Sequence, residues 1–266
     1  MRQFSAAYLD RTRAGMWADS REALTDLDLD GRERVLDVGC GTGELTRVLR
    51  EETPGEVVGC DADSELLAHL GPPTVRGDAT RLPFRADAFD LVVCQALLIN
   101  LPDPAAAIEE FARVSSDLVA AVEPDNAAVA VDSTVDAEGP LANCARRRFL
   151  DGVDTDVTLG AGAGELLEAA GLRDVRTRRY DHERTIEPPY GEAALTDAKR
   201  KATGEGLEKN RETMLDGDTS PDEFDALRAD WRAMGRDVIE QMQDDDYRRS
   251  ETVPFYVSVG RVPDST

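Results

Sequence analysis

The chain has 266 residues, with 31 basic and 54 acidic side chains and a formal net charge of −23. This length suits a single domain, residues 1–266, with a substantial core, whereas the acidic excess argues against a nucleic-acid-binding surface, which would need a basic face. No apolar run is long enough to span a bilayer, and the first residues lack a signal-peptide core, so we expect a soluble, cytoplasmic protein with no membrane partner.

Nearly all of the basic residues are arginine, because lysine occurs only at Lys199, Lys201 and Lys209. An acidic excess with scarce lysine resembles the proteins of salt-loving archaea, in which molar salt screens the repulsion between like charges. We therefore hypothesise a halophilic protein from a haloarchaeon.

The four cysteines are widely separated and form no Cys-x-x-Cys pair; they are Cys40, Cys60, Cys94 and Cys144. We expect free, mostly buried thiols in a reducing compartment. Because the chain also contains only two histidines, we expect no metal site.

Residues 2–29 are predicted to be helical and are followed by a turn signal at Asp30-Gly31. The next apolar residues, Val35, Leu36 and Val38, have no helical repeat and are predicted to form a buried strand. Glycines then alternate at Gly39, Gly41 and Gly43, and an amphipathic stretch predicts a helix. Glycine permits a sharp turn and lets a ligand approach the backbone, while the free amides at the start of the helix face that ligand.

The glycine spacing distinguishes two classes of cofactor. A dinucleotide-binding fold requires Gly-x-Gly-x-x-Gly, whose third glycine would fall at position 44, where Glu44 stands. A carboxylate there is a poor neighbour for a pyrophosphate and is compatible with a positively charged ligand. The pattern Asp37-x-Gly39-x-Gly41-x-Gly43 instead resembles the first motif of class I S-adenosylmethionine-dependent methyltransferases. The resemblance implies a cofactor site that includes Asp37, Gly39, Cys40, Gly41 and Gly43.

The second predicted strand, residues 56–61, ends in a carboxylate. A side chain at the position of Asp61 can accept two hydrogen bonds from a ribose diol. Residues 61–67 are similar to the corresponding strand end and helix start of the family, which adds Ala62 to the cofactor site. Asp63 or Ser64 is expected to cap the next helix.

The third and fourth strands are predicted over residues 74–76 and 89–94. By resemblance to the family, Asp78 would accept the adenine amino group and Ala79 would lie beside the adenine ring. Gln95 stands where the family often places a residue beside the methionine part of the cofactor.

The fifth strand is predicted over residues 118–122 and ends at Glu123, the best single candidate for a general base. Such a base is needed only if the acceptor is a weakly acidic hydroxyl or a carbon acid; a loop acid is the alternative role. Residues 115–117 are Ser-Ser-Asp instead of the commonest Gly-Gly turn of the family, so no well-known subfamily is assigned.

Two stretches, residues 126–160 and 190–250, are expected to be insertions on the substrate side. The three arginines at 146–148 could face an anionic substrate, although a solvated helix face paired with nearby acids is favoured. A capping box at 220–223 begins a helix whose apolar stripe is expected to pack on the body of the protein. Residues 253–260 are predicted to be the antiparallel closing strand.

The resemblance implies an α/β fold with a doubly wound, mostly parallel, seven-stranded sheet of Rossmann-like methyltransferase type, in which helical insertions form a cap. It also implies transfer of a methyl group from S-adenosyl-L-methionine to a small-molecule acceptor, with S-adenosyl-L-homocysteine as the product. The alternatives are a non-catalytic S-adenosylmethionine-binding regulator and a nicotinamide-dependent oxidoreductase, which Glu44 disfavours.

The N-terminal residues 1–30 have two possible roles. In many small-molecule methyltransferases an N-terminal helix lies over the cofactor, and by that resemblance Tyr8, Arg13 and Trp17 are candidates for a lid or for substrate contacts. The alternative is an aromatic patch that packs on the edge of the sheet. No motif indicates the acceptor or the oligomeric state.

Overall fold

The computed structural model describes residues 16–263, which divide into two compact units. Unit 1 comprises the described residues up to Asp125 together with residues 158–180 and the described residues from 254 onward. Unit 2 comprises residues 126–157 and 181–253. The strands β7 and β8 contribute residues to both units.

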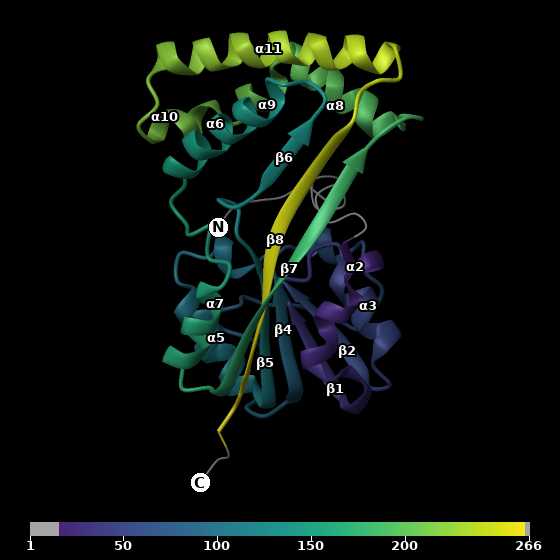
Figure 1. Cartoon of the computed structure of the whole chain (residues 1–266). Helices are drawn as coiled ribbons and strands as arrows, with labels where there is room; N and C mark the ends of the chain where they lie inside the picture. The colour runs from purple at the N-terminus through teal and green to yellow at the C-terminus, as the bar shows by residue number, and fades with distance from the viewer. Residues whose placement is uncertain (1–15, 264–266) are drawn as a thin grey trace. The chain divides into compact units, whose positions relative to one another are not determined.

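The sheet of unit 1 has the strand order β3-β2-β1-β4-β5-β8, and β7 also pairs with β8 (Figure 1). Strands β1 to β5 run parallel, and β8 is antiparallel to β5. The order reverses between β1 and β4, and open α/β sheets bind ligands at such a switch point. The strands are β1 (Arg34–Val38), β2 (Glu56–Asp61), β3 (Thr74–Arg76), β4 (Phe89–Gln95), β5 (Ser115–Pro124), β7 (Arg173–Ile186) and β8 (Arg249–Arg261).

The predicted mixed α/β fold with a mostly parallel sheet and an antiparallel closing strand is confirmed. Within the described residues the sheet has eight strands, one more than predicted. The additional strand is β6 (Ala130–Ser133), which pairs antiparallel with the first residues of β8 in unit 2. Its four residues alternate between exposed and half-buried, so no apolar run marked it in the sequence.

Helices cover both faces of the unit 1 sheet, with α2 and α3 on one face and α5 and α7 on the other (Figure 1). The described part of the segment predicted as one helix consists of the short α2 and a 3-10 turn, because Ser20 leaves helical dihedral angles. None of the helices between residues 16 and 263 is both long and apolar enough to cross a membrane. The helical elements of unit 1 are α2 (Met16–Asp19), η1 (Arg21–Leu27), η2 (Leu29–Gly31), α3 (Glu44–Glu52), α4 (Ser64–Leu67), η3 (Leu98–Asn100), α5 (Pro104–Val114) and α7 (Gly162–Ala169).

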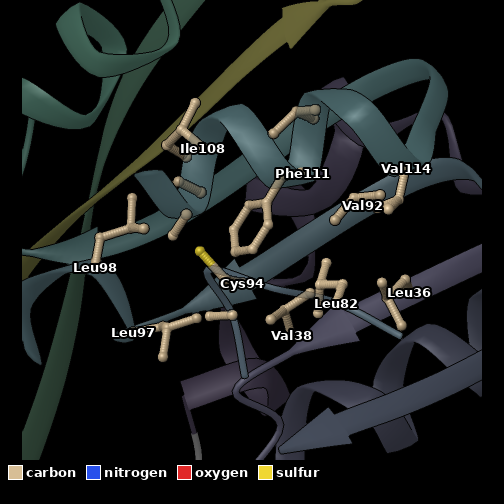
Figure 2. Close-up of a cluster of buried hydrophobic side chains, with 14 of the residues drawn as sticks. Leu36, Val38, Leu82, Val92, Cys94, Leu97, Leu98, Ile108, Phe111 and Val114 are labelled. Atoms are coloured by element: carbon tan, nitrogen blue, oxygen red, sulfur yellow. The ribbon is translucent and has the colours of Figure 1, made fainter. Parts of the chain in front are cut away.

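One hydrophobic cluster fills the space between α5 and the sheet. Figure 2 shows Ile108, Phe111 and Val114 of α5 lying over Val92 and Cys94 of β4. All five side chains are completely buried. Burial of an aliphatic or aromatic side chain of this size contributes about 1.5–3 kcal/mol, so this contact holds β4, and with it the loop that follows β4, against the body of unit 1.

A second cluster covers the opposite face of the sheet. It joins Trp17 and Leu27 from the N-terminal segment to Leu49 of α3 and to Phe255 of β8. Trp17 is 3% exposed, and its ring meets the Phe255 ring edge-on at 6.1 Å. The described part of the N-terminal segment, from residue 16 onward, is therefore packed on the sheet.

Unit 2 is mainly helical, and its longest helix, α11, packs on α8 and α6 (Figure 1). The predicted capping box is confirmed, because Ser220 Oγ accepts from Glu223 N at 3.3 Å and Glu223 Oε2 accepts from Ser220 N at 2.9 Å. The apolar stripe of α11 lies in the two cores of unit 2. The helices are α6 (Glu138–Asp151), α8 (Glu192–Thr203), α9 (Glu205–Glu208), α10 (Arg211–Asp216) and α11 (Pro221–Gln243).

A buried charge cluster also holds unit 2 together. Glu138 is 1% exposed, and its carboxylate accepts hydrogen bonds from Lys201 Nζ, from Tyr247 OH at 2.9 Å and from Ser133 Oγ at 2.6 Å. Arg249 Nε lies 3.2 Å from the same carboxylate. Burial raises the pKa of Glu138, but Lys201, Ser133 and Arg249 outweigh it, so the pKa lies below its ordinary value.

Candidate functional site

The glycine turn between β1 and α3 has a backbone that only glycine adopts without strain. The φ angles are +70° at Gly39, +55° at Gly41 and +85° at Gly43. A Cβ atom on Gly39 would lie 2.8 Å from Leu97 Cδ1, and one on Gly43 would lie 2.4 Å from Leu70 Cδ1. The turn thus needs glycine both for its left-handed dihedral angles and for its close approach to neighbouring side chains.

Asp61 ties the ends of three neighbouring strands together. Its Oδ2 accepts from Gly41 N in the glycine turn at 2.8 Å, and its Oδ1 accepts from Asp63 N at 2.8 Å. Its main-chain oxygen accepts from Gly77 N after β3 at 3.0 Å. The side chain is nearly buried, at 8% exposure. A carboxylate has about four lone-pair positions, so these two side-chain bonds leave acceptor capacity for a ligand hydroxyl.

Asp63 is the residue that caps α4. Its side chain accepts from Glu65 N at 2.8 Å and from Leu66 N at 3.4 Å. Of the two caps considered from the sequence, Asp63 and Ser64, the first is therefore correct.

Asp37 lies inside β1 and braces the strand against α3. Its Oδ2 accepts from Thr46 Oγ1 at 2.5 Å, and the residue is 1% exposed.

Burial, together with the charges of Asp61 and Asp37, raises the pKa of the Cys60 thiol to about 12. Burial, Asp37 and Asp61 likewise raise the pKa of Cys40 well above its usual value. These thiols stay protonated at neutral pH, so they act as small apolar side chains.

The cysteines between residues 16 and 263 are all free, as predicted. Three of them are buried and Cys144 is half-buried. Within the same residues, no group of three or more His, Cys, Asp or Glu side chains is arranged to hold a metal ion.

Asp78 and Ala79 follow β3 and face different surroundings. Asp78 is exposed, and its Oδ1 accepts from Thr80 N at 2.9 Å and from Thr80 Oγ1 at 2.8 Å. Ala79 is 8% exposed and belongs to the hydrophobic cluster under α5. The carboxylate therefore faces outward next to the end of β2, where it can accept a further bond.

Gln95, at the end of β4, contacts Met16 and Trp17. Its Oε1 accepts from Trp17 Nε1 at 3.3 Å, and its Nε2 lies 3.1 Å from Met16 Sδ. Trp17 thus contacts both a predicted cofactor residue and the sheet. The other two lid candidates, Tyr8 and Arg13, lie outside the described residues.

Glu123, at the end of β5, is fully buried and binds the backbone of the loop after β4. Its Oε1 accepts from Leu97 N at 3.0 Å and from Leu98 N at 2.8 Å. Cys94 Sγ lies 3.8 Å from the same oxygen, and burial together with the Glu123 charge raises the pKa of that thiol. Oε1 of this carboxylate thus contacts both the loop backbone and the Cys94 thiol.

Ala96 is a feature of the site that sequence reasoning missed. Its φ is +48°, and within residues 16–263 every other residue with a positive φ is Gly or Asp. A strained backbone of this kind costs on the order of 1–3 kcal/mol. Ala96 N donates to Val122 O at 2.8 Å and Ala96 O accepts from Asn100 Nδ2 at 2.9 Å. Together with the bonds from Glu123, these contacts hold the strained loop at the switch point.

The carboxyl ends of β1, β2, β3 and β4 therefore gather the glycine turn, Asp61, Asp78 and Gln95 in unit 1. The register places Val38 beside Cys60 and Cys94, so these ends lie at one edge of the sheet. Arg76 at the end of β3 donates to Ala62 O at 3.0 Å, and Asp61 and Asp78 place two carboxylates at this edge. These carboxylates favour a ligand with hydroxyl donors and a positive charge over a pyrophosphate.

Residues 36–117 match a family of known proteins described as a methyltransferase domain. The demethylmenaquinone methyltransferase of Lactiplantibacillus plantarum is 36% identical over 107 residues, which cover 35% of this chain and 45% of that protein. The demethylmenaquinone methyltransferase of Corynebacterium kroppenstedtii is 38% identical over 91 residues, which cover 33% of this chain and 39% of that protein. The chain thus spans less than half the length of these curated relatives.

Two solved structures share the fold at low identity. A candidate methyltransferase from Bacillus halodurans is 18% identical with a TM-score of 0.53, over 92% of this chain and 99% of that one. A candidate methyltransferase in complex with the Trm112 methyltransferase activator of Haloferax volcanii is 17% identical with a TM-score of 0.51, over 98% of this chain and 96% of that one. Residues 36–117 are therefore similar to a methyltransferase domain, and the chain shares the Rossmann-like methyltransferase fold of these solved structures.

Proposed function

We propose that the protein transfers a methyl group from S-adenosyl-L-methionine to a small-molecule acceptor and releases S-adenosyl-L-homocysteine. The observation that carries this proposal is the hydrogen bond from Gly41 N to Asp61 Oδ2, which joins a left-handed glycine turn to a buried strand-end carboxylate at 2.8 Å. Both residues lie in the segment that matches the methyltransferase domain.

The cofactor would be held by side chains and backbone at the carboxyl edge of the sheet. Asp61 would accept hydrogen bonds from the ribose diol, which its remaining lone pairs allow. Asp78 would accept a bond from the adenine amino group, which its exposure allows. The turn would line the cofactor through backbone atoms, because its glycines carry no Cβ atoms that would crowd the ligand. The proposed set is Asp37, Gly39, Cys40, Gly41, Gly43, Asp61, Ala62, Asp78, Ala79 and Gln95.

Asp37 would serve this set through the glycine turn, because its carboxylate accepts from Thr46 Oγ1 of α3. We assign it to holding the strand and helix on either side of the turn. Its negative charge also favours a cationic ligand nearby, and so does the charge of Glu44 in the first turn of α3.

The cofactor, when bound, supplies a sulfonium methyl that is already a strong electrophile. The protein therefore mainly needs to hold the acceptor in line at near contact, which can supply about 7–11 kcal/mol of the barrier. Gln95 and Trp17 contact each other at the end of β4, and their contact would help to close this edge of the sheet to water.

Glu123 is proposed as a positioning residue and not as the general base. Its carboxylate is 0% exposed and accepts from Leu97 N and Leu98 N, so it is occupied in shaping the loop that follows β4. A base that acts on the acceptor must lie within hydrogen-bond reach of it.

The cofactor assignment is tested by calorimetric titration with S-adenosylhomocysteine. Asp61→Ala is expected to weaken binding by about 1–3 kcal/mol, the value of a charge-assisted hydrogen bond. Because Asp61 also holds Gly41 N, Asp63→Ala is the matched control: it removes the neighbouring carboxylate and the cap of α4, which costs about 1 kcal/mol of stability. Equal affinities of Asp61→Ala and the wild type would remove Asp61 from the site.

Methyl transfer is tested with methyl-labelled S-adenosylmethionine and the low-molecular-weight fraction of a cell extract. Transfer of label to a small molecule supports the proposal. Binding without transfer would instead favour the non-catalytic regulator. Because two relatives are named demethylmenaquinone methyltransferases, demethylmenaquinone is the first defined acceptor to test.

The acidic, lysine-poor composition leads us to propose a halophilic protein that works in the cytoplasm at high salt. Molar salt would screen the repulsion among the 54 acidic side chains.

A further inference from the structure

Unit 2 contains a pocket of about 340 Å³ that shares no residue with the proposed cofactor site. One wall is the loop that leads into β6, and the other wall is one side of α6. The lining residues are Ala127, Ala128, Val129, Ala130, Asn143, Arg146, Arg147 and Leu150.

The pocket has an apolar wall of small side chains. Ala127, Ala128 and Ala130 expose their methyl groups, while Val129 is buried behind them. Leu150 adds apolar surface from α6. Such a wall suits the short apolar body of a small molecule.

The polar part of the pocket is cationic. Arg146 is half-buried, and its Nη1 donates to Val129 O at 2.6 Å and to Asn143 Oδ1 at 2.9 Å. These bonds fix the guanidinium on the pocket wall and occupy the two N–H groups of Nη1. Of the five N–H donors of arginine, those on Nε and Nη2 remain. Burial and the nearby charge of Arg249 lower the pKa of Arg146, but an arginine remains charged at neutral pH.

The three consecutive arginines on α6 differ in their partners. Arg148 lies 3.9 Å from Glu223. Within residues 16–263, neither Arg146 nor Arg147 forms an ion pair with a carboxylate. In a chain with 54 acidic side chains, two adjacent arginines that line one pocket and have no acidic partner among the described residues are unexpected. The pairing with acids favoured from the sequence thus applies to Arg148, whereas Arg147 is exposed without a carboxylate partner among the described residues.

We propose that this pocket binds the anionic group, carboxylate or phosphate, of a small organic molecule. Arg147 and the remaining donors of Arg146 hold the anion, since guanidinium groups match the geometry of both. The alanine wall takes the apolar body. In so acidic a protein an anion needs local cations to bind at all, because the mean field of the chain repels it. The assignment stands on unit 2 alone and does not depend on methyl transfer.

The test is calorimetric titration of the full chain, without S-adenosylmethionine and at constant ionic strength, with four probes: hexanoate, hexyl phosphate, inorganic phosphate and the neutral hexanol. We expect saturable one-site binding of at least one hexyl anion and none of hexanol. The hexyl anion that binds more tightly identifies the anionic group that the pocket prefers. Absence of saturable binding of both hexyl anions would overturn the proposal.

Three variants place the binding in this pocket. The side chain of Arg147 is exposed, and Arg147→Gln is expected to weaken binding of the anion about tenfold. Arg146→Gln is expected to weaken it at least as much, with far-UV circular dichroism and denaturation checking that the Val129 loop still folds. Arg236→Gln, an exposed arginine on α11, removes the same charge elsewhere in unit 2 and should leave affinity unchanged within about twofold. Equal weakening by Arg236→Gln and Arg147→Gln, or wild-type affinity in Arg147→Gln, would contradict the proposal.

Discussion

Substitution of Glu123 separates a positioning role from a catalytic one. Glu123→Gln keeps a side-chain oxygen that can accept the bonds from Leu97 N and Leu98 N, but it removes the ability to take up a proton in the pH range of the reaction. Glu123→Ala removes the acceptor altogether. The two variants therefore differ in how they affect the loop, while both abolish any base.

The expected size of the effect follows from the buried contacts. Glu123 is 0% exposed, and its Oε1 accepts two amides at 3.0 and 2.8 Å. Each buried amide N–H left without an acceptor costs about 1–3 kcal/mol. Because Glu123→Ala leaves two such amides, it should lower the free energy of unfolding by about 2–6 kcal/mol. The strain at Ala96 adds a reason for the loop to relax once these bonds are lost. In Glu123→Gln the bonds persist without charge assistance, and the loss should be only about 1–2 kcal/mol.

The assays are urea denaturation in molar KCl, S-adenosylhomocysteine calorimetry and methyl transfer. Glu123→Gln should bind and transfer at close to wild-type levels, whereas Glu123→Ala should lose stability and cofactor affinity together. A Gln variant that folds and binds normally but transfers about 10²–10⁴-fold more slowly would make Glu123 the general base. Wild-type stability of Glu123→Ala would also refute the reasoning.

Three further predictions concern the glycine turn, the buried charge cluster of unit 2 and the dependence of stability on salt. Gly43→Ala should cost about 2–5 kcal/mol of stability, because it combines a positive φ with a Cβ placed 2.4 Å from Leu70 Cδ1. The control is Gly71→Ala at an exposed position, where a Cβ would meet nothing within 4 Å. Equal stabilities of the two variants would contradict the account. Glu138→Gln should cost about 3–5 kcal/mol at neutral pH by leaving Lys201 without its buried partner. Because the pKa of Glu138 is lowered in the folded state, its contribution to stability is complete above the ordinary pKa of about 4.3 and is lost as the pH falls through the lowered pKa. Identical pH–stability profiles of wild type and Glu138→Gln would refute this role. The urea midpoint should rise from dilute buffer to molar KCl, and full stability in dilute buffer would refute the halophilic hypothesis.

The parts of the site that depend on local backbone demands were predictable from the sequence. The apolar run of β1 followed by Gly39, Gly41 and Gly43 specifies a strand, a left-handed turn and a helix within a few residues. The capping box at the start of α11 is equally local, since Ser220 and Glu223 satisfy each other's backbone amides. Such features need no knowledge of the rest of the chain.

Features that depend on contacts distant in sequence were not predictable. Glu123 holds the amides of Leu97 and Leu98, which lie about 25 residues earlier in the chain. Nothing about an alanine indicates a positive φ, so Ala96 could not be identified before the surrounding hydrogen bonds were known. Asn100 Nδ2 donates to Ala96 O, and that contact exists only in the folded chain.

Unit 2 illustrates the same limit on a larger scale. Strand β6 alternates half-buried and exposed residues without an apolar run, and it pairs with β8 more than 100 residues later. Glu138 meets Lys201 across 63 residues. Charged residues at such separations give no sequence pattern, because their pairing is decided by tertiary packing.

The central claim, a cofactor site for S-adenosylmethionine and not for a dinucleotide, is tested most directly by thermal unfolding with S-adenosylhomocysteine and with NAD⁺ in molar KCl. A ligand that binds only the folded state adds about 2.7 kcal/mol at a concentration of 100 times its dissociation constant. The account predicts a higher melting temperature with S-adenosylhomocysteine and no change with NAD⁺. A rise with NAD⁺ and none with S-adenosylhomocysteine would contradict it.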